Sequence, residues 1–201
     1  MSGETTYQER LERIQKAMRC EPVDRIPVIY QGAAFSPRYM GMSIAEFCAS
    51  GEASANVTLE ALDRLSQFGT IDGINSAPVV RITAALTTQW LSRIGVPGRD
   101  LPPDSLWQVR EEEVMTHADY DSIIEKGYGQ FLMGYLPKVI DMGEFQEFMA
   151  WSQTMAEPLT HKYQEHGYVV ITGAFGSIPF EFFCGGRSME KFYLDLYRMP
   201  D

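Results

Sequence analysis

Residues 13–30, RIQKAMRCEPVDRIPVIY, indicate how the chain begins to fold. The apolar residues before and within this stretch recur at helical spacing. They follow a Thr6-x-x-Glu9 pattern of the capping-box type, so residues 6–19 are predicted to form an amphipathic helix. Two prolines then bracket a connector, and residues 26–30 form a short apolar run of strand length. The stretch therefore predicts a helix that leads directly into a strand.

Two further strands are predicted along the chain. Residues 168–174, YVVITGA, form the clearest apolar and β-branched run. Residues 70–76 are a second candidate, although Asp72 and Gly73 weaken the strand pattern. Segments of crossover length separate the three strands, so we expect them to be adjacent and parallel.

Helical patterns occupy most of the intervening sequence. They comprise a short helix opened by Ser43-x-x-Glu46, an apolar stripe from Leu59 to Phe68 that ends at Gly69, a long helix around Phe145 that Pro158 kinks or interrupts, and a last helix over residues 188–199. Strands that alternate with helices favour the α/β class. We expect a single domain over residues 1–201, with an excursion over about 95–166 whose first part, residues 95–105, runs over the surface.

Composition excludes several classes of function. The net charge of −10 repels phosphate backbones, so nucleic acid is not an expected partner. No apolar stretch is long enough to cross a bilayer, and no membrane partner is expected. Three scattered cysteines without C-x-x-C spacing are typical of a reduced cytoplasmic protein. A cytoplasmic enzyme or binding protein remains.

Several stretches together resemble one enzyme superfamily. Residues 13–28 resemble the opening of the uroporphyrinogen decarboxylase superfamily, in which a helix and an E-P-V-D-R connector lead into the first strand of the barrel. Residues 62–74, 101–128 and 171–201 resemble later segments in the family's order. The resemblance implies the N-terminal portion of a (β/α)8 TIM barrel, with about three parallel strands and an incomplete barrel. In this fold the chemistry lies at the carboxyl ends of the strands.

The chain departs from the family's decarboxylases at three landmarks. After the first strand, those enzymes carry an Arg-Gln-Ala-Gly-Arg motif that binds substrate carboxylates, whereas this chain has no arginine before Arg38. Their substrate-polarising aspartate corresponds to residues 77–79, where no acidic residue stands. Their tyrosine after the third strand corresponds to Glu181. Porphyrin decarboxylation is therefore the less favoured chemistry.

The resemblance instead favours the superfamily's corrinoid-dependent branch. Its members move methyl groups between a small methylated compound and a corrinoid protein, and many use a zinc-bound thiol. The implied partners are thus a small-molecule substrate and a corrinoid protein, and a homo-oligomer stays open. We expect no cofactor to be bound by this segment, since corrinoid and zinc contacts belong to the other half of a complete member. Uroporphyrinogen decarboxylase activity and a non-catalytic binding subunit remain as alternatives.

Candidate substrate-binding residues follow from position, because each lies at or after a predicted strand end. They are Tyr30, Gln31, Arg38, Asn75, Phe175 and Glu181. Each could equally be a rim residue without a ligand, and no catalytic residue is assigned. No metal site is predicted, because the chain has no His-x-Cys pair. A local hydrogen bond is expected for His117, which precedes Asp119, and Cys184 is expected to fill the core.

Overall fold

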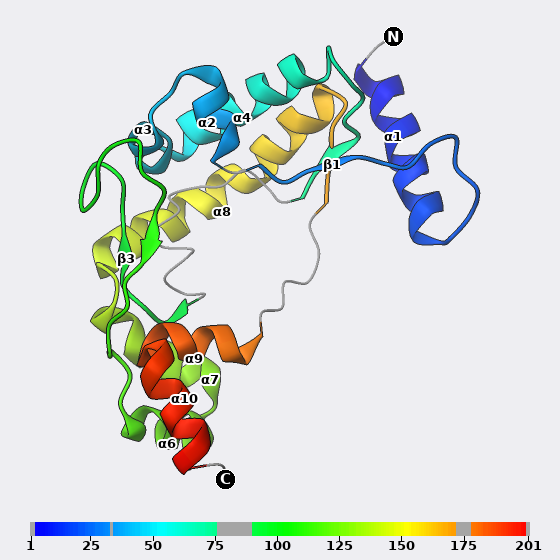
Figure 1. Cartoon of the computed structure of the whole chain (residues 1–201). Coiled ribbons are helices and arrows are strands. Elements are labelled where there is room, and N and C mark those ends of the chain that lie inside the picture. Colours follow the sequence, from blue (N-terminus) through cyan, green and yellow to red (C-terminus); the bar gives the residue numbers. More distant parts are fainter. Residues whose placement is uncertain (1–2, 33, 76–89, 172–177, 200–201) are drawn as a thin grey trace. The chain divides into compact units, whose positions relative to one another are not determined.

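The computed structural model describes residues 3–32, 34–75, 90–171 and 178–199. The chain is an α/β protein that divides into two compact units (Figure 1). Unit 1 comprises Met1–Val80 and Ala150–Ala174, and unit 2 comprises Arg81–Met149 and Phe175–Asp201. The single domain expected over residues 1–201 stays a prediction, because one domain can contain two such units. In the described part of the chain, no helix is both long and apolar enough to cross a bilayer.

A three-stranded parallel sheet lies in unit 1. Its strands are β1 (Ile29–Tyr30), β2 (Gly73–Ile74) and β5 (Val169–Val170), in the order β1-β2-β5. In the register Ile29 pairs with Gly73, and Ile74 pairs with Val170. The prediction of three adjacent parallel strands is confirmed. Each strand is shorter than the apolar run that predicted it, and part of the runs 70–76 and 168–174 lies outside the described residues.

Helices surround the sheet in unit 1. They are α1 (Gly3–Met18), α2 (Phe35–Met40), α3 (Ile44–Ala49), α4 (Gly51–Leu65) and the C-terminal half of α8 (Met142–Glu165). The short helix predicted to open at Ser43-x-x-Glu46 is confirmed as α3, and these two residues form a capping box. The Ser43 hydroxyl accepts from the Glu46 N–H at 3.2 Å, and the Glu46 carboxylate accepts from the Ser43 N–H at 3.0 Å.

Three predicted helix boundaries are wrong. Because α1 begins at Gly3, Thr6 lies inside the helix and cannot cap it. Helix α4 ends at Leu65 rather than at Gly69, since the Phe68 N–H reaches only three residues back, to the Leu65 carbonyl. The Phe68 side chain is accordingly 81% exposed. Of the two outcomes expected at Pro158, a kink or an interruption, the interruption is wrong, because α8 continues through this residue.

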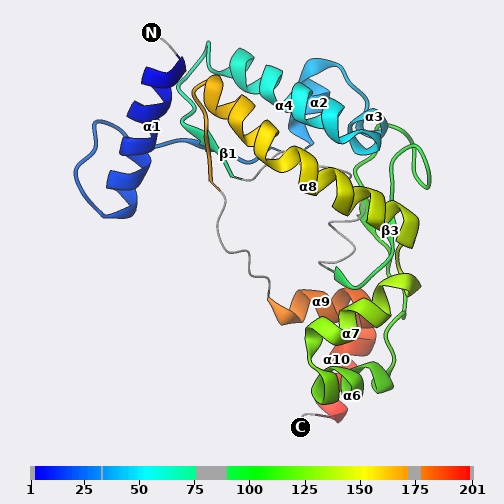
Figure 2. The same cartoon turned by 180° about the vertical axis from the view of Figure 1, so that it is seen from behind.

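The core of unit 1 lies between the sheet and two helices that run side by side, α4 and the end of α8 (Figures 1 and 2). Leu62 from α4 and Ile74 from β2 meet the buried ring of Tyr163 from α8. Burying a large apolar side chain stabilises a fold by about 2 kcal/mol. The Tyr163 hydroxyl donates to the Ala55 carbonyl at 2.9 Å, so the one polar atom of this ring is also satisfied.

A network of ion pairs lies at the amino end of the sheet. Asp72, the residue before β2, is fully buried. Its two oxygens accept from Arg25 at 2.6 and 2.7 Å, from Arg13 at 2.8 Å and from the Val28 N–H at 2.8 Å. Arg13 also binds Asp24 at 2.7 Å. The network therefore joins α1 and the connector to the start of the sheet.

The protonation of Asp72 follows from these contacts. Burial acts to raise its pKa, but the hydrogen bonds from Arg25 and the Val28 N–H outweigh it and hold the pKa below the ordinary value. Asp72 is thus a buried carboxylate at neutral pH. Asp72, which weakened the strand prediction, therefore binds the start of β2 to Arg13, Arg25 and the backbone of Val28.

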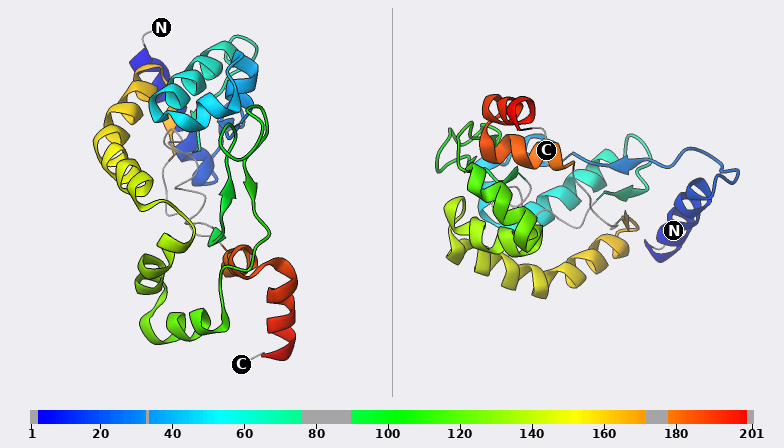
Figure 3. Two further views of the ribbon diagram at one scale, coloured as in Figure 1. Left: turned by 90° about the vertical axis from the view of Figure 1, so that its left-hand side faces the viewer. Right: turned by 90° about the horizontal axis from the view of Figure 1, so that it is seen from below.

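Unit 2 is built from a β-hairpin and helices (Figure 3). Strand β3 (Ile94–Gly95) pairs antiparallel with β4 (Gln108–Val109). The helices are α6 (His117–Lys126), α7 (Tyr128–Tyr135), the short η1 (Leu136–Lys138), the start of α8, α9 (Pro179–Arg187) and α10 (Met189–Arg198). Residues 95–105 were expected on the surface and lie mainly between the two strands of this hairpin. Residues 98–105 are exposed or partly exposed, whereas Gly95, Val96 and Pro97 are buried.

The core of unit 2 gathers around α7. Phe131 and Tyr135 from this helix pack with Leu91 and Met115. The Gly186 carbonyl accepts from the Met115 N–H at 2.7 Å, so the end of α9 is bound to this core through its backbone. A Cβ at Gly186 would lie 2.6 Å from the Met115 sulfur. Glycine therefore lets α9 approach the core without displacing the Met115 side chain.

Candidate functional site

The carboxyl edge of the sheet in unit 1 carries three of the predicted binding residues. Tyr30 ends β1 and Asn75 follows β2, and the Asn75 N–H donates to the Tyr30 carbonyl at 3.0 Å. Gln31 follows Tyr30, and both Gln31 and Asn75 are exposed. The structure therefore brings Tyr30, Gln31 and Asn75 to one edge, as the parallel arrangement of the strands predicts.

The Tyr30 side chain is bound to its own loop. Its hydroxyl donates to the Gly32 carbonyl at 2.9 Å and lies 2.6 Å from the hydroxyl of the buried Ser36. A Cβ at Gly32 would lie 2.6 Å from the Tyr30 hydroxyl, so the loop depends on glycine there. Burial raises the pKa of Tyr30, and the ring is a neutral wall at pH 7. Gln31 and Asn75 are the exposed polar side chains described at this edge.

The other predicted residues are elsewhere. Arg38 lies exposed in α2 of unit 1. Glu181 lies exposed in the first turn of α9 and belongs to unit 2. Phe175 and residues 77–79 lie outside the described residues.

A second cluster of polar side chains lies in unit 2 and was not predicted. Arg187, at the end of α9, is only 3% exposed. It donates to Asp195 at 2.7 Å, to the Glu113 carboxylate and to the Met115 carbonyl at 2.8 Å. Asp195 also accepts from the Tyr120 hydroxyl at 3.0 Å. Residues from α6, α9 and α10 thus meet at one buried ion pair.

The local hydrogen bond predicted for His117 is wrong. Thr116 and Asp119 form the capping box of α6 with each other, and the His117 side chain takes no part in it. Its Nε2 lies 2.9 Å from Asp195 and 3.1 Å from Arg187. One sequence signal points to this cluster: Asp195 lies between Phe192 and Leu196 in the apolar stripe of α10, and a carboxylate in such a stripe requires a buried cation.

The charge states of Asp195 and Tyr120 are fixed at neutral pH. The hydrogen bond from Arg187 lowers the pKa of Asp195 to about 2. Burial, followed by the bond to Asp195, raises the pKa of Tyr120 to about 12. The cluster therefore presents an ionised carboxylate and a neutral phenol.

An aromatic pocket of about 680 Å³ opens beside this cluster. Helix α6 lines it with His117, Tyr120 and Asp121, and apolar rings from α9 and α10 form the facing wall. Among these are Phe180, Phe183 and Phe192. Small-molecule sites commonly combine such a volume, apolar walls and a few polar groups.

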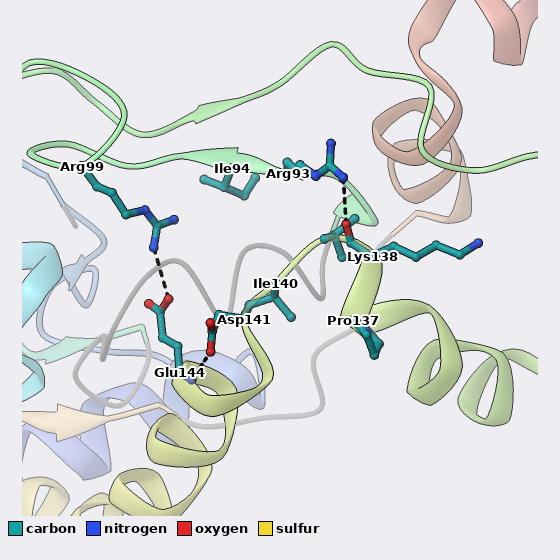
Figure 4. A pocket seen from close by; sticks show the side chains of 9 residues that line it. Arg93, Ile94, Arg99, Pro137, Lys138, Ile140, Asp141 and Glu144 are labelled. Atoms are coloured by element: carbon teal, nitrogen blue, oxygen red, sulfur yellow. Dashed lines mark hydrogen bonds and ion pairs between the residues drawn. The ribbon is translucent and has the colours of Figure 1, made fainter.

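A smaller pocket of about 280 Å³ in unit 2 is polar (Figure 4). Its three cations already have anionic partners. Arg99 binds Glu144 at 3.2 Å, Arg93 binds Glu112 at 2.8 Å, and Lys138 binds Asp119 at 2.9 Å. Arg93 also donates to the Lys138 carbonyl at 3.2 Å. An acidic ligand would have to displace these pairs, so the pocket is not a ready carboxylate site.

The His, Asp and Glu side chains that line the two pockets are not grouped around a metal position in the part of the chain that the structure describes. Throughout the described ranges, no group of three His, Cys, Asp or Glu side chains is arranged to hold a metal ion. Cys184, expected as buried filler, is only half-buried on α9 because that face of the helix is partly open to solvent. Burial and the nearby Glu111 carboxylate raise its pKa, so it stays a thiol at neutral pH.

No family model, curated protein or solved structure matches this chain. The functional interpretation consequently depends on the residues themselves.

Proposed function

We propose that this chain forms the N-terminal part of a uroporphyrinogen decarboxylase-like TIM barrel that moves a methyl group from a small methylated compound to a corrinoid protein. The observation that carries the proposal is the parallel order β1-β2-β5 with Gln31 and Asn75 exposed at its carboxyl edge. In TIM barrels, substrates bind at this end of the strands. The family resemblance of the sequence supplies the reaction class.

The chemistry of this edge supports a neutral substrate. Carboxamide side chains such as Gln31 and Asn75 donate to ether and carbonyl oxygens and accept from hydroxyl and amine groups. A porphyrinogen carries several carboxylates that require cations. At this edge, the described residues among 29–37 and 73–75 contain no lysine or arginine, and the first basic residue after β1 is Arg38. Methyl transfer is therefore favoured over porphyrin decarboxylation.

In this proposal the corrinoid is a co-substrate carried by a partner protein. When bound in its reduced form, it would supply the acceptor for the methyl group; the methyl–oxygen bond of the substrate would break, and the released oxygen would take up a proton. The residues of this chain would position the substrate. Tyr30 and its loop form a fixed wall, and the Gln31 and Asn75 amides bind the substrate oxygen.

The activity test uses the chain with reduced cobalamin and 4-methoxybenzyl alcohol. We expect consumption of reduced cobalamin together with release of the demethylated phenol. The double variant Gln31→Ala, Asn75→Ala should be slower by about tenfold, the effect of losing two hydrogen bonds of about 0.7 kcal/mol each. Its unfolding midpoint should be unchanged, because both side chains are exposed. Carbon dioxide release from uroporphyrinogen, with no methyl transfer, would instead establish the decarboxylase alternative.

Substrate charge gives a separate prediction. In titrations at equal concentrations, the methoxylated aromatic should bind at least about tenfold more tightly than coproporphyrin, since unpaired carboxylates are costly to desolvate. Tight porphyrin binding that disappears in Arg38→Ala, but persists in a control variant of the exposed Arg19, would contradict this. It would show that the anion site has moved to α2.

A further inference from the structure

The aromatic pocket of unit 2 carries acidic side chains in its described lining. Two carboxylates, Asp121 and Asp195, line it, and its described lining includes neither lysine nor arginine. The guanidinium that binds Asp195, that of Arg187, is buried and is shared with a second carboxylate, Glu113. One guanidinium thus faces two carboxylates, and Lys191 reaches only Glu113, at 3.8 Å. The electrostatic potential in the pocket is therefore negative.

The aromatic rings that line the pocket also favour a cationic ligand. Phe180 packs edge-on against Phe192, with ring centroids 5.1 Å apart, and Tyr120 packs edge-on against Phe183 at 5.6 Å. Aromatic faces carry negative partial charge and attract cations. The rings are held by one another and by the buried ion pair, so the wall is formed before a ligand arrives.

We infer that this pocket binds a hydrophobic organic cation, an aromatic amine whose ring packs against Phe180, Phe183 and Phe192. Its ammonium group binds between the carboxylates of Asp121 and Asp195. Asp195 already accepts from Arg187 and Tyr120 and lies 2.9 Å from His117 Nε2, so it is fixed in place. Asp121 is exposed and makes no hydrogen bond or ion pair with another described residue, which leaves its carboxylate for the ligand. The volume of about 680 Å³ suits a molecule of two or three fused rings.

This inference is independent of the proposed methyl transfer, which concerns the sheet edge of unit 1. A failure of either one leaves the other untouched, because binding to the pocket is measured without cobalamin.

The test uses three ligands with the same ring and different charge: 2-naphthylmethylamine, 2-naphthylmethanol and 2-naphthoate. Calorimetric titration of the full chain should give the tightest binding for the amine. Its affinity should exceed that of the alcohol by about tenfold, consistent with an ammonium that gains both carboxylate and ring contacts. The carboxylate should not bind. Raising the salt from about 0.05 M to 0.5 M should weaken the amine alone, because only its binding is electrostatic.

Two variants separate charge from apolar contact. Asp121→Asn should reduce the affinity for the amine by about fivefold and leave the alcohol unchanged, the expected effect of one partly exposed carboxylate. The matched control is Glu125→Gln, one turn further along α6 and outside the pocket, which should change neither ligand. Phe180→Ala, at a side chain 39% exposed and so tolerated by the fold, should weaken the amine and the alcohol alike.

Equal affinities for the amine and the alcohol would overturn the inference, since the pocket would then be a plain apolar cavity. Binding of the naphthoate, binding of none of the three ligands, or an unchanged amine affinity in Asp121→Asn would overturn it as well.

Discussion

Asp72→Asn is expected to lower the free energy of unfolding by about 3 kcal/mol, the effect of breaking a buried ion pair. The asparagine has the same shape but no charge, so Arg25 and Arg13 would lose their shared anion at the amino end of the sheet. Both arginines are partly exposed and can turn toward water, which keeps the expected loss at the lower end of the range for buried pairs. Urea denaturation followed by circular dichroism measures the change.

Asp24→Asn is the matched control, because Asp24 binds the same Arg13 from an exposed position. Its effect should be much smaller than that of Asp72→Asn. Equal effects of the two variants would show that the buried position of Asp72 is irrelevant.

The same network gives a pH dependence. The pKa of Asp72 is lower in the folded chain than in the unfolded one, so its contribution is fully present above the ordinary aspartate pKa of about 3.9. That contribution is lost as the pH falls from there through the lower folded value. The stability of the wild-type chain should therefore decline more steeply in this acidic window than that of Asp72→Asn. Parallel pH profiles would contradict the assignment.

Gly73→Ala is expected to destabilise the chain by about 3 kcal/mol, near the top of the range for overpacking. A Cβ at this position would overlap the backbone carbonyl of Val169, on the neighbouring strand β5. A backbone atom in a sheet cannot move aside as a flexible side chain can, so β2 and β5 would have to separate.

Gly69→Ala is the control for chain entropy. The space around Gly69 is open for at least 4 Å, and alanine there should be neutral or slightly stabilising. Thermal unfolding of both variants tests the difference. A Gly73→Ala variant as stable as Gly69→Ala would rule out close packing of β2 against β5.

The arrangement of the sheet could be predicted because its signals are local. Apolar runs of strand length, separated by helical segments, led to three adjacent parallel strands and to Tyr30 and Asn75 at a common edge. The ends of the elements were predicted less well. Phe68 continues the apolar period of α4, yet the chain turns at Ser66, whose hydroxyl lies 2.9 Å from that of Tyr168. That contact joins residues far apart in sequence, so the spacing of apolar residues along the chain does not indicate it.

The cluster in unit 2 was missed for the same reason. His117, Arg187 and Asp195 come from three helices, and each residue alone has an ordinary explanation. Helix α9 was not predicted either, and two adjacent glycines near its end are unfavourable in a helix. They are instead the positions where the helix contacts the backbone of Trp90 and the side chain of Met115. Both the cluster and helix α9 depend on contacts between residues far apart in sequence, which a single sequence does not reveal.

The position of Asp72 has a consequence for evolvability. The ionic network and the close contact at Gly73 constrain the amino end and interior of β2, whereas Gln31 and Asn75 at the carboxyl end are exposed and bear little of the folding energy. Residues at that end can be exchanged one at a time without first acquiring compensating stability. Selection for a new substrate would therefore act on Gln31 and Asn75 along short mutational paths, while the sequence around Asp72 stays fixed across such variants.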